Sequence, residues 1–226
     1  MVEWGYVKIG GVPVKKLLSA LCAVCLCLFL LTVSIGLPIY FRPFYYGHIG
    51  AYDLEAVSGY TESEIRDAYD EVLDYLTLPG KEFGTGVIPH SEEGKAHFAD
   101  CKGLFTLNSV VLLGFGGVLA VLFAMRKKWG PYRLGKRSAA FWAAVLSVTL
   151  PVIIGVLAAL DFDRAFTLFH TIFFPGKTNW IFDWYADPII RVLPQEFFRN
   201  CAILIGLALV WMAGGILVWE GRKKRK

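Results

Sequence analysis

The chain has 226 residues, of which 56% are hydrophobic and 19% charged, and its formal net charge at pH 7 is +4. Four long apolar segments, each without Asp, Glu, Lys, Arg or His, lie at residues 17–40, 103–125, 138–160 and 201–219. Segments of this length and composition exclude an ordinary water-soluble domain and indicate a membrane protein.

The four apolar segments have about the length, roughly 20 residues, that a helix needs to cross a bilayer core. Lipid offers the backbone no hydrogen-bond partners, so spanning segments must be helical. We therefore predict an all-α polytopic protein, with residues 1–226 as one membrane domain. The first segment is too long for a signal peptide and lacks a small-x-small cleavage site, so we interpret it as a retained anchor.

The basic residues predict the orientation. Of 23 lysines and arginines, 14 lie in the N-terminal arm, in the loop 126–137 and in the tail from Arg222 to Lys226. The positive-inside rule places both termini in the cytoplasm of a bacterial cell membrane, and residues 41–102 and 161–200 outside, as an extracytoplasmic helical cap. The same basic residues are expected to face anionic membrane lipids, and no nucleic-acid partner is expected.

In the first long loop, Thr61 and Glu64 form the pattern of a capping box. Apolar residues then recur at steps of three and four, which predicts an amphipathic helix from about 62 to 78. Pro79-Gly80 ends it, and its acidic face is interpreted as solvated surface.

Ser91 is expected to cap a short helix that continues into the second span. This helix places His97, Asp100 and Leu104 on one face, because residues three and four apart are neighbours on a helix. His97 is then one or two turns above the hydrocarbon.

The second long loop combines charged and aromatic residues at one membrane depth. If the third helix continues past Leu160, Asp161, Arg164 and His170 share a side. Pro175-Gly176 then reverses the chain.

No G-x-S-x-G, H-E-x-x-H or Walker-type motif is present. Two histidines beside carboxylates, His97 and His170, remain as candidates for general acid–base catalysis such as acyl transfer. Candidate orienting and oxyanion-stabilising groups surround them in sequence: Asp100, Asp161, Asp163, Arg164, Lys177, Asn179 and Trp180.

Other interpretations remain open. The donors His90, His97, Asp100 and His170 contain no tight pair such as H-x-x-x-H, so no metal is expected, although a metal-dependent hydrolase on the outer face is an alternative. A non-catalytic scaffold or a transporter component is another, although no charge lies within a span. Cys101 and Cys201 are either a disulfide or two free thiols.

Three motifs resemble those of the bacterial lipoprotein intramolecular transacylase family. His97-Phe-Ala-Asp100-Cys101-Lys102-Gly-Leu-Phe105 is similar to its H-x-x-D-V-K-x-L-F element. The second motif joins Asp161-Phe-Asp163, Phe169-His170-x-x-Phe173-Phe174, Asn179-Trp180 and Phe182-Asp183, and the third is Leu193-Pro194-Gln195-Glu196-Phe197-Phe198. The resemblance covers residues 17–219. Cys101 stands where Val is usual, and Trp184-Tyr185 where a Pro-containing turn is common. We expect neither departure to touch the histidines.

The resemblance implies an acyl shift within one lipoprotein molecule, at the outer face of the membrane. The sn-2 acyl chain of the diacylglyceryl-modified N-terminal cysteine moves to the α-amino group of that cysteine and leaves a lyso-lipoprotein. His97 and His170 match the two catalytic histidines of the family. No cofactor is implied, because acyl donor and acceptor belong to the same molecule.

Overall fold

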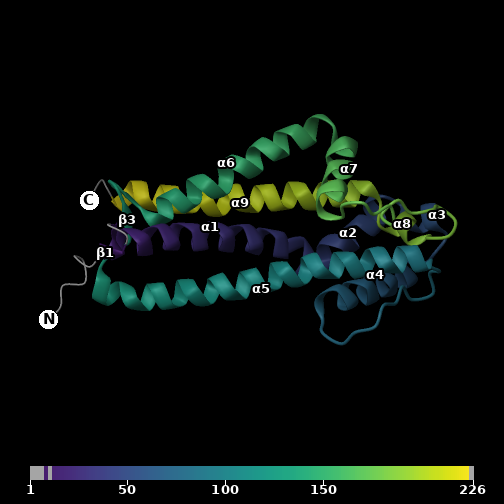
Figure 1. The fold of residues 1–226 in the computed structure, drawn as a ribbon. Coiled ribbons are helices and arrows are strands. Elements are labelled where there is room, and N and C mark those ends of the chain that lie inside the picture. Colours follow the sequence, from purple (N-terminus) through teal and green to yellow (C-terminus); the bar gives the residue numbers. More distant parts are fainter. Residues whose placement is uncertain (1–7, 10–11, 224–226) are drawn as a thin grey trace. The chain divides into compact units, whose positions relative to one another are not determined.

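The computed structural model describes residues 8–9 and 12–223, so Lys224, Arg225 and Lys226 of the basic tail lie outside the described residues. Within these ranges four helices are long and apolar enough to cross a membrane, which confirms the all-α membrane fold (Figure 1). They are α1 (Val14–Tyr40), α5 (Glu92–Trp129), α6 (Ala139–Leu160) and α9 (Gln195–Lys223).

Two of these helices begin well before their apolar segments. α5 begins at Glu92, and α9 begins at Gln195. Ser91 caps α5 as expected, because its hydroxyl accepts the Gly94 N–H at 2.9 Å. The extra turns of α5 carry His97 and Asp100 on the helix that also forms the second span.

Shorter elements complete the described chain. The helices are α2 (Pro43–Ala51), α3 (Leu54–Ser58), α4 (Glu62–Thr77), α7 (Phe162–Phe173) and α8 (Ile189–Val192). Two antiparallel pairs of two-residue strands join β1 (Lys8–Ile9) to β2 (Val12–Pro13) and β3 (Arg133–Leu134) to β4 (Arg137–Ser138).

The chain forms two compact units. The first contains residues 1–35, 109–154 and 205–226, and the second contains residues 36–108 and 155–204. Both candidate histidines, and every other candidate site residue, belong to the second unit.

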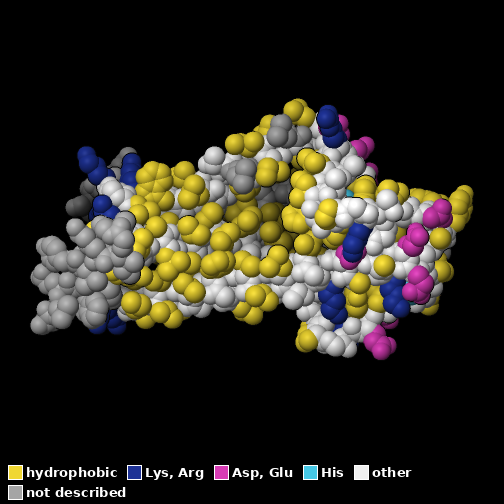
Figure 2. Space-filling model, in the orientation of Figure 1, with side chains coloured by type: hydrophobic (Ala, Val, Ile, Leu, Met, Phe, Trp, Pro, Cys, Tyr) yellow, Lys and Arg dark blue, Asp and Glu magenta, His cyan; other side chains and the backbone are white. Residues whose placement is uncertain are grey.

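In the first unit, hydrogen bonds connect the turn before α6 to α5 and to α1. Tyr132 is buried and donates its hydroxyl hydrogen to the Leu122 carbonyl at 3.0 Å, and the Arg133 N–H donates to the Ser19 hydroxyl at 3.0 Å. Large apolar side chains such as Leu113 and Phe123 stay exposed on α5, at 76% and 73%. Figure 2 shows hydrophobic side chains gathered over the spanning helices, as expected of surfaces whose solvent is lipid.

The second unit has its own aromatic core. Tyr45 of α2 is fully buried and stacks on Tyr69 of α4 with ring centroids 3.7 Å apart. The Tyr45 hydroxyl donates to the Val192 carbonyl at 2.7 Å, so α2, α4 and the end of α8 share one core with Phe197 of α9. Burial raises the pKa of Tyr45 well above its ordinary value, which keeps this buried hydroxyl neutral.

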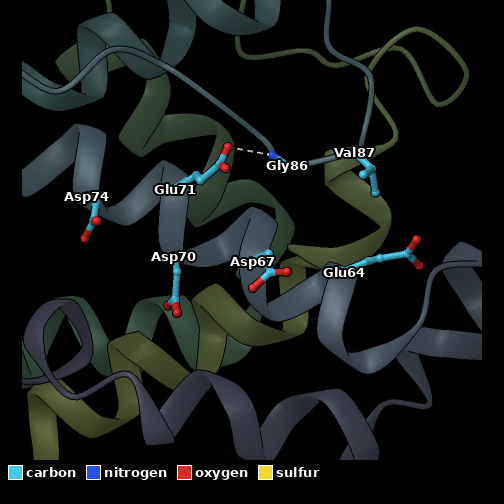
Figure 3. Close-up of a pocket in the computed structure, with 7 residues that line it drawn as sticks. All are labelled: Glu64, Asp67, Asp70, Glu71, Asp74, Gly86 and Val87. Carbon is cyan, nitrogen blue, oxygen red and sulfur yellow. Dashed lines mark hydrogen bonds between the residues drawn. The ribbon is translucent and has the colours of Figure 1, made fainter.

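The helix predicted over residues 62–78 is α4, and its capping box between Thr61 and Glu64 is confirmed. Its acidic face is more than the solvated surface that the sequence suggests. Arg42 forms ion pairs with both Asp70 and Asp74, and the Glu71 carboxylate accepts the Gly86 N–H at 2.8 Å (Figure 3). These bonds attach α2 and the segment after α4 to this face.

Candidate functional site

The first turn of α5 is held by a buried carboxylate. Asp187, which precedes α8 and is 3% exposed, accepts the Ser91 N–H and the Ser91 hydroxyl hydrogen, both at 2.8 Å. Gly94 packs so closely against Asp187 that an added Cβ atom would collide with its carboxylate, and the Cβ atom would also press on the Phe182 ring. These contacts fix the backbone one turn before His97.

The two candidate histidines come together in the second unit. His97 of α5 and His170 of α7 are each 6% exposed, and their ring centroids are 5.7 Å apart. Phe174 contacts both rings, with centroid separations of 5.1 Å from His97 and 5.8 Å from His170. Both imidazoles therefore lie in a largely apolar, water-poor setting, where electrostatic interactions are strengthened.

The tautomer of His170 follows from its hydrogen bond. Its Nδ1 lies 2.7 Å from the Phe166 carbonyl oxygen, which only accepts. Nδ1 therefore carries the hydrogen, and the neutral ring keeps a lone pair on Nε2. Trp180 stacks on the ring at a centroid separation of 4.6 Å. Burial lowers the pKa of His170 below its ordinary value of 6.5, against a smaller opposing effect of the bond to Phe166, so the neutral form dominates at pH 7.

His97 has a different environment. Its Nδ1 is buried and has no hydrogen-bond partner among the described residues, whereas its Nε2 lies 3.4 Å from the Cys101 sulfur. The expectation that Cys101 does not touch the histidines is therefore wrong. The contact arises because residues four apart lie above one another on a helix. Phe182 packs edge-on against the His97 ring at 5.5 Å.

Asp100 binds two side chains of the segment that follows α7. Its carboxylate accepts hydrogen bonds from Lys177 and from the Asn179 side-chain nitrogen, the latter at 3.0 Å. The Asn179 side-chain oxygen is left buried and without a hydrogen-bond partner within the described chain. The Trp180 ring nitrogen donates to the Lys177 carbonyl at 3.0 Å, which helps to hold the indole that stacks on His170.

Three predicted site residues lie elsewhere. The third helix does not continue: α6 ends at Leu160, and Asp161 has an extended backbone and caps α7 by accepting the Arg164 N–H at 3.0 Å. Asp163 accepts a hydrogen bond from Gln195 of α9, and Arg164 is exposed. The condition under which Asp161, Arg164 and His170 would share a side is therefore not met, because Asp161 lies between two separate helices.

Sequence reasoning missed several groups that shape the site. Asp187 is not among the predicted site residues, and Phe174 enters the sequence analysis only as part of a family motif. The Phe166 carbonyl has no sequence signal beyond its position four residues before His170. Asp187 follows an aromatic, chain-reversing segment and precedes a proline, which is a weak signal for a buried loop carboxylate.

The structure also bears on the metal-site and disulfide alternatives. In the described part of the chain, no three His, Cys, Asp or Glu side chains are grouped so as to hold a metal ion. His90 bonds to Thr85 at 3.0 Å and packs against Phe83. All five cysteines are free thiols, and Cys101 and Cys201 pack against the core of the second unit.

Comparisons with known proteins agree with this fold. The family described as "Lipoprotein intramolecular transacylase Lit" matches residues 20–198. The membrane-integral lipoprotein intramolecular transacylase Lit of Bacillus cereus has a solved structure with a TM-score of 0.83 and 22% identity, covering 94% of this chain and 98% of its own. A structure of a histidine-to-alanine variant of that protein gives a TM-score of 0.77 at 22% identity, covering 94% of this chain and 96% of its own.

A curated relative from Aquifex aeolicus, described as an uncharacterized protein, is 28% identical over 92 residues. That match covers 41% of this chain and 41% of the relative's length.

Proposed function

Because the chain belongs to the lipoprotein intramolecular transacylase family, we propose that it moves an acyl chain from oxygen to nitrogen within one lipoprotein molecule. The substrate is a lipoprotein whose N-terminal cysteine carries a thioether-linked diacylglyceryl group. The sn-2 acyl chain passes to the α-amino group of that cysteine, and the product is a lyso-lipoprotein.

One observation carries the mechanism: two buried imidazoles, 5.7 Å apart between ring centroids, converge from separate helices. His170 has its lone pair fixed on Nε2 by the Phe166 carbonyl and is the general base. His97 is the partner that faces developing negative charge. We assign the Cys101 S–H as the donor to His97 Nε2, which leaves a hydrogen on Nδ1, an atom without a partner among the described residues.

The reaction needs no outside acyl donor. The neutral α-amine attacks the sn-2 ester carbonyl, and His170 removes a proton from the nitrogen as the C–N bond forms. The hydrogen on His97 Nδ1 stabilises the oxyanion of the tetrahedral intermediate. The C–O bond to glycerol then breaks, and His170 returns its proton to the departing oxygen. An ester and an amine become an amide and an alcohol, with no net proton or water exchanged.

Proximity supplies much of the rate enhancement, because amine and ester already share a small scaffold. The polar groups at Asp100 hold the segment that brings Trp180 against His170. We also propose that the site faces outside and that both termini are cytoplasmic. α5 supports this orientation, because it carries His97 near its start and Arg126, Lys127 and Lys128 in its last turn.

The test is expression of the chain in a bacterial host that lacks other N-acylating enzymes, with a diacylated reporter lipopeptide analysed by fragmentation mass spectrometry. The wild-type chain should produce the N-acyl lyso form. His97→Ala and His170→Ala should each abolish it while the protein remains in the membrane.

His90→Ala is the matched control, because His90 is exposed and bonds to Thr85 rather than to the site. It should keep full product formation. Product from either site variant at the wild-type level would remove that histidine from the mechanism. Release of free fatty acid without N-acyl product, abolished by a chelator, would instead favour the metal-dependent hydrolase.

A further inference from the structure

The Asn179 side chain has a defined orientation. Its Nδ2 lies 3.0 Å from the Asp100 carboxylate, which only accepts, so the nitrogen of the amide must face Asp100. The carboxylate also binds Lys177, which holds it in place. The amide oxygen, Oδ1, is therefore committed to the opposite direction and is available only as an acceptor.

This oxygen is buried and receives no hydrogen bond from the described residues. A buried polar atom without a partner is unfavourable and calls for a ligand or a bound water. The site contains a second such atom, Nδ1 of the 6%-exposed His97. Asn179 is connected to both histidines through its neighbours. Its partner Asp100 lies three residues after His97 on α5, and Trp180, the residue that follows Asn179, stacks on His170.

We propose that Asn179 Oδ1 accepts an N–H of the substrate's α-amino group and so selects lipoproteins with a free amino terminus. This inference rests on the proposed function. It replaces the oxyanion-donor role suggested for Asn179 by the sequence, because the oxygen and not the nitrogen is left for substrate.

The arrangement accounts for both hydrogens of a neutral primary amine. One N–H is held by Asn179 and stays on nitrogen in the amide product. The other is removed by His170 Nε2. With both hydrogens held, the nitrogen lone pair is directed at the ester carbonyl. An amino terminus that is already acylated has one N–H and no basic lone pair, so it fails to satisfy both groups.

The test uses unreactive lipopeptides with an sn-2 ether in place of the ester. One analogue has the α-amino group, and the other has hydrogen in its place. Binding to the purified full chain in detergent is measured for both by fluorescence anisotropy. The wild-type chain should bind the amino analogue about tenfold more tightly or better, as a hydrogen bond from a charged or strongly polar donor allows.

Asn179→Ala should remove the part of this preference that Asn179 supplies and leave only what the bond to His170 Nε2 provides, while the affinity for the des-amino analogue stays unchanged. Asn179→Ser retains an acceptor oxygen and should recover part of the preference. Thr178→Ala changes the exposed neighbouring side chain and should keep the full preference.

A preference that stays at the wild-type level in Asn179→Ala, as it would if the oxygen binds only a buried water, overturns the inference. Equal loss of both analogues in the alanine and serine variants also overturns it, because it indicates a purely structural role. The ester lipopeptide is tested in the same preparation. If the wild-type chain performs no O-to-N transfer, the proposed function is refuted. If it performs the transfer but the amine preference is unchanged in Asn179→Ala, only the role of Asn179 is refuted.

Discussion

At His170, a backbone carbonyl accepts the hydrogen bond from Nδ1 that a carboxylate accepts in many histidine sites. The Phe166 carbonyl accepts from Nδ1 one helical turn earlier, so the orientation of the ring is fixed by the helix that carries it. A carbonyl brings no negative charge, and it therefore raises the basicity of the ring less than a carboxylate would. The result is a base that is neutral and ready to accept a proton at physiological pH.

The pKa of His170 gives a prediction at this scale. Since burial disfavours the imidazolium, the midpoint of its titration should lie below 6.5. NMR of ¹³C-labelled imidazole in detergent, with the signal assigned from His170→Gln, measures it directly. A midpoint above 6.5 would contradict the role of burial.

The same shift predicts the direction of acid destabilisation. Between pH 6.5 and the lower folded-state pKa of His170, the unfolded chain binds more protons than the folded chain. Stability supplied by neutral His170 is therefore present above pH 6.5 and is lost as the pH falls. In His170→Gln, the loss of thermal stability between pH 7 and pH 5 should be smaller than in the wild-type chain.

At the scale of elements, the start of α5 depends on a residue far away in sequence. Asp187 receives two hydrogen bonds from Ser91 and lies against Gly94. Asp187→Ala should lower the free energy of unfolding by about 1–3 kcal/mol, because it leaves two donors of the half-buried Ser91 unpaired. Thermal unfolding in detergent measures the change.

Glu93→Gln is the matched control, because Glu93 is exposed in the same turn of α5. Its effect should stay within about 0.5 kcal/mol. If Asp187→Ala unfolds at the wild-type temperature, the buried carboxylate does not anchor α5.

The helices were predictable to the extent that local signals determine them. Thr61 and Glu64 predict the start of α4, and Ser91 predicts the start of α5, because a side chain caps the backbone within three residues. The break at Asp161 was not predicted. Asp is also compatible with a continuing helix, and only its extended backbone shows that it caps α7.

The site itself was predictable only in part. The spacing of His97 and Asp100 places both on one helix face, but nothing local indicates that Lys177 and Asn179 meet Asp100 from 77 and 79 residues away. The sequence suggested Lys177 and Asn179 only as candidate oxyanion donors, and neither the spacing nor the family resemblance paired them with Asp100. The stacking of Trp180 on His170 and the burial of Asp187 depend on tertiary packing, which no sequence period encodes.

At the scale of the whole molecule, composition alone identified the four spanning helices, since a bilayer imposes a minimum length and excludes charge. The distribution of lysine and arginine adds an orientation, which labelling in intact cells tests. In a cysteine-free background, an impermeant maleimide should modify Lys95→Cys, on an exposed position near His97. It should not modify Lys136→Cys, between β3 and β4.

Cell lysis supplies the control for this labelling, because both variants should react once the membrane is opened. The reverse pattern in intact cells would turn the site towards the cytoplasm and end the proposal that exported lipoproteins are its substrates.

Gly94 has a consequence for sequence variation. It has no functional group, yet any side chain there would meet the Asp187 carboxylate and the Phe182 ring. Phe182 also packs against the ring of His97, so a displaced phenylalanine would disturb that histidine. In a saturation library selected for activity, position 94 should therefore be as depleted of variants as the histidines themselves, and a drug that crowded this glycine would leave few routes to resistance.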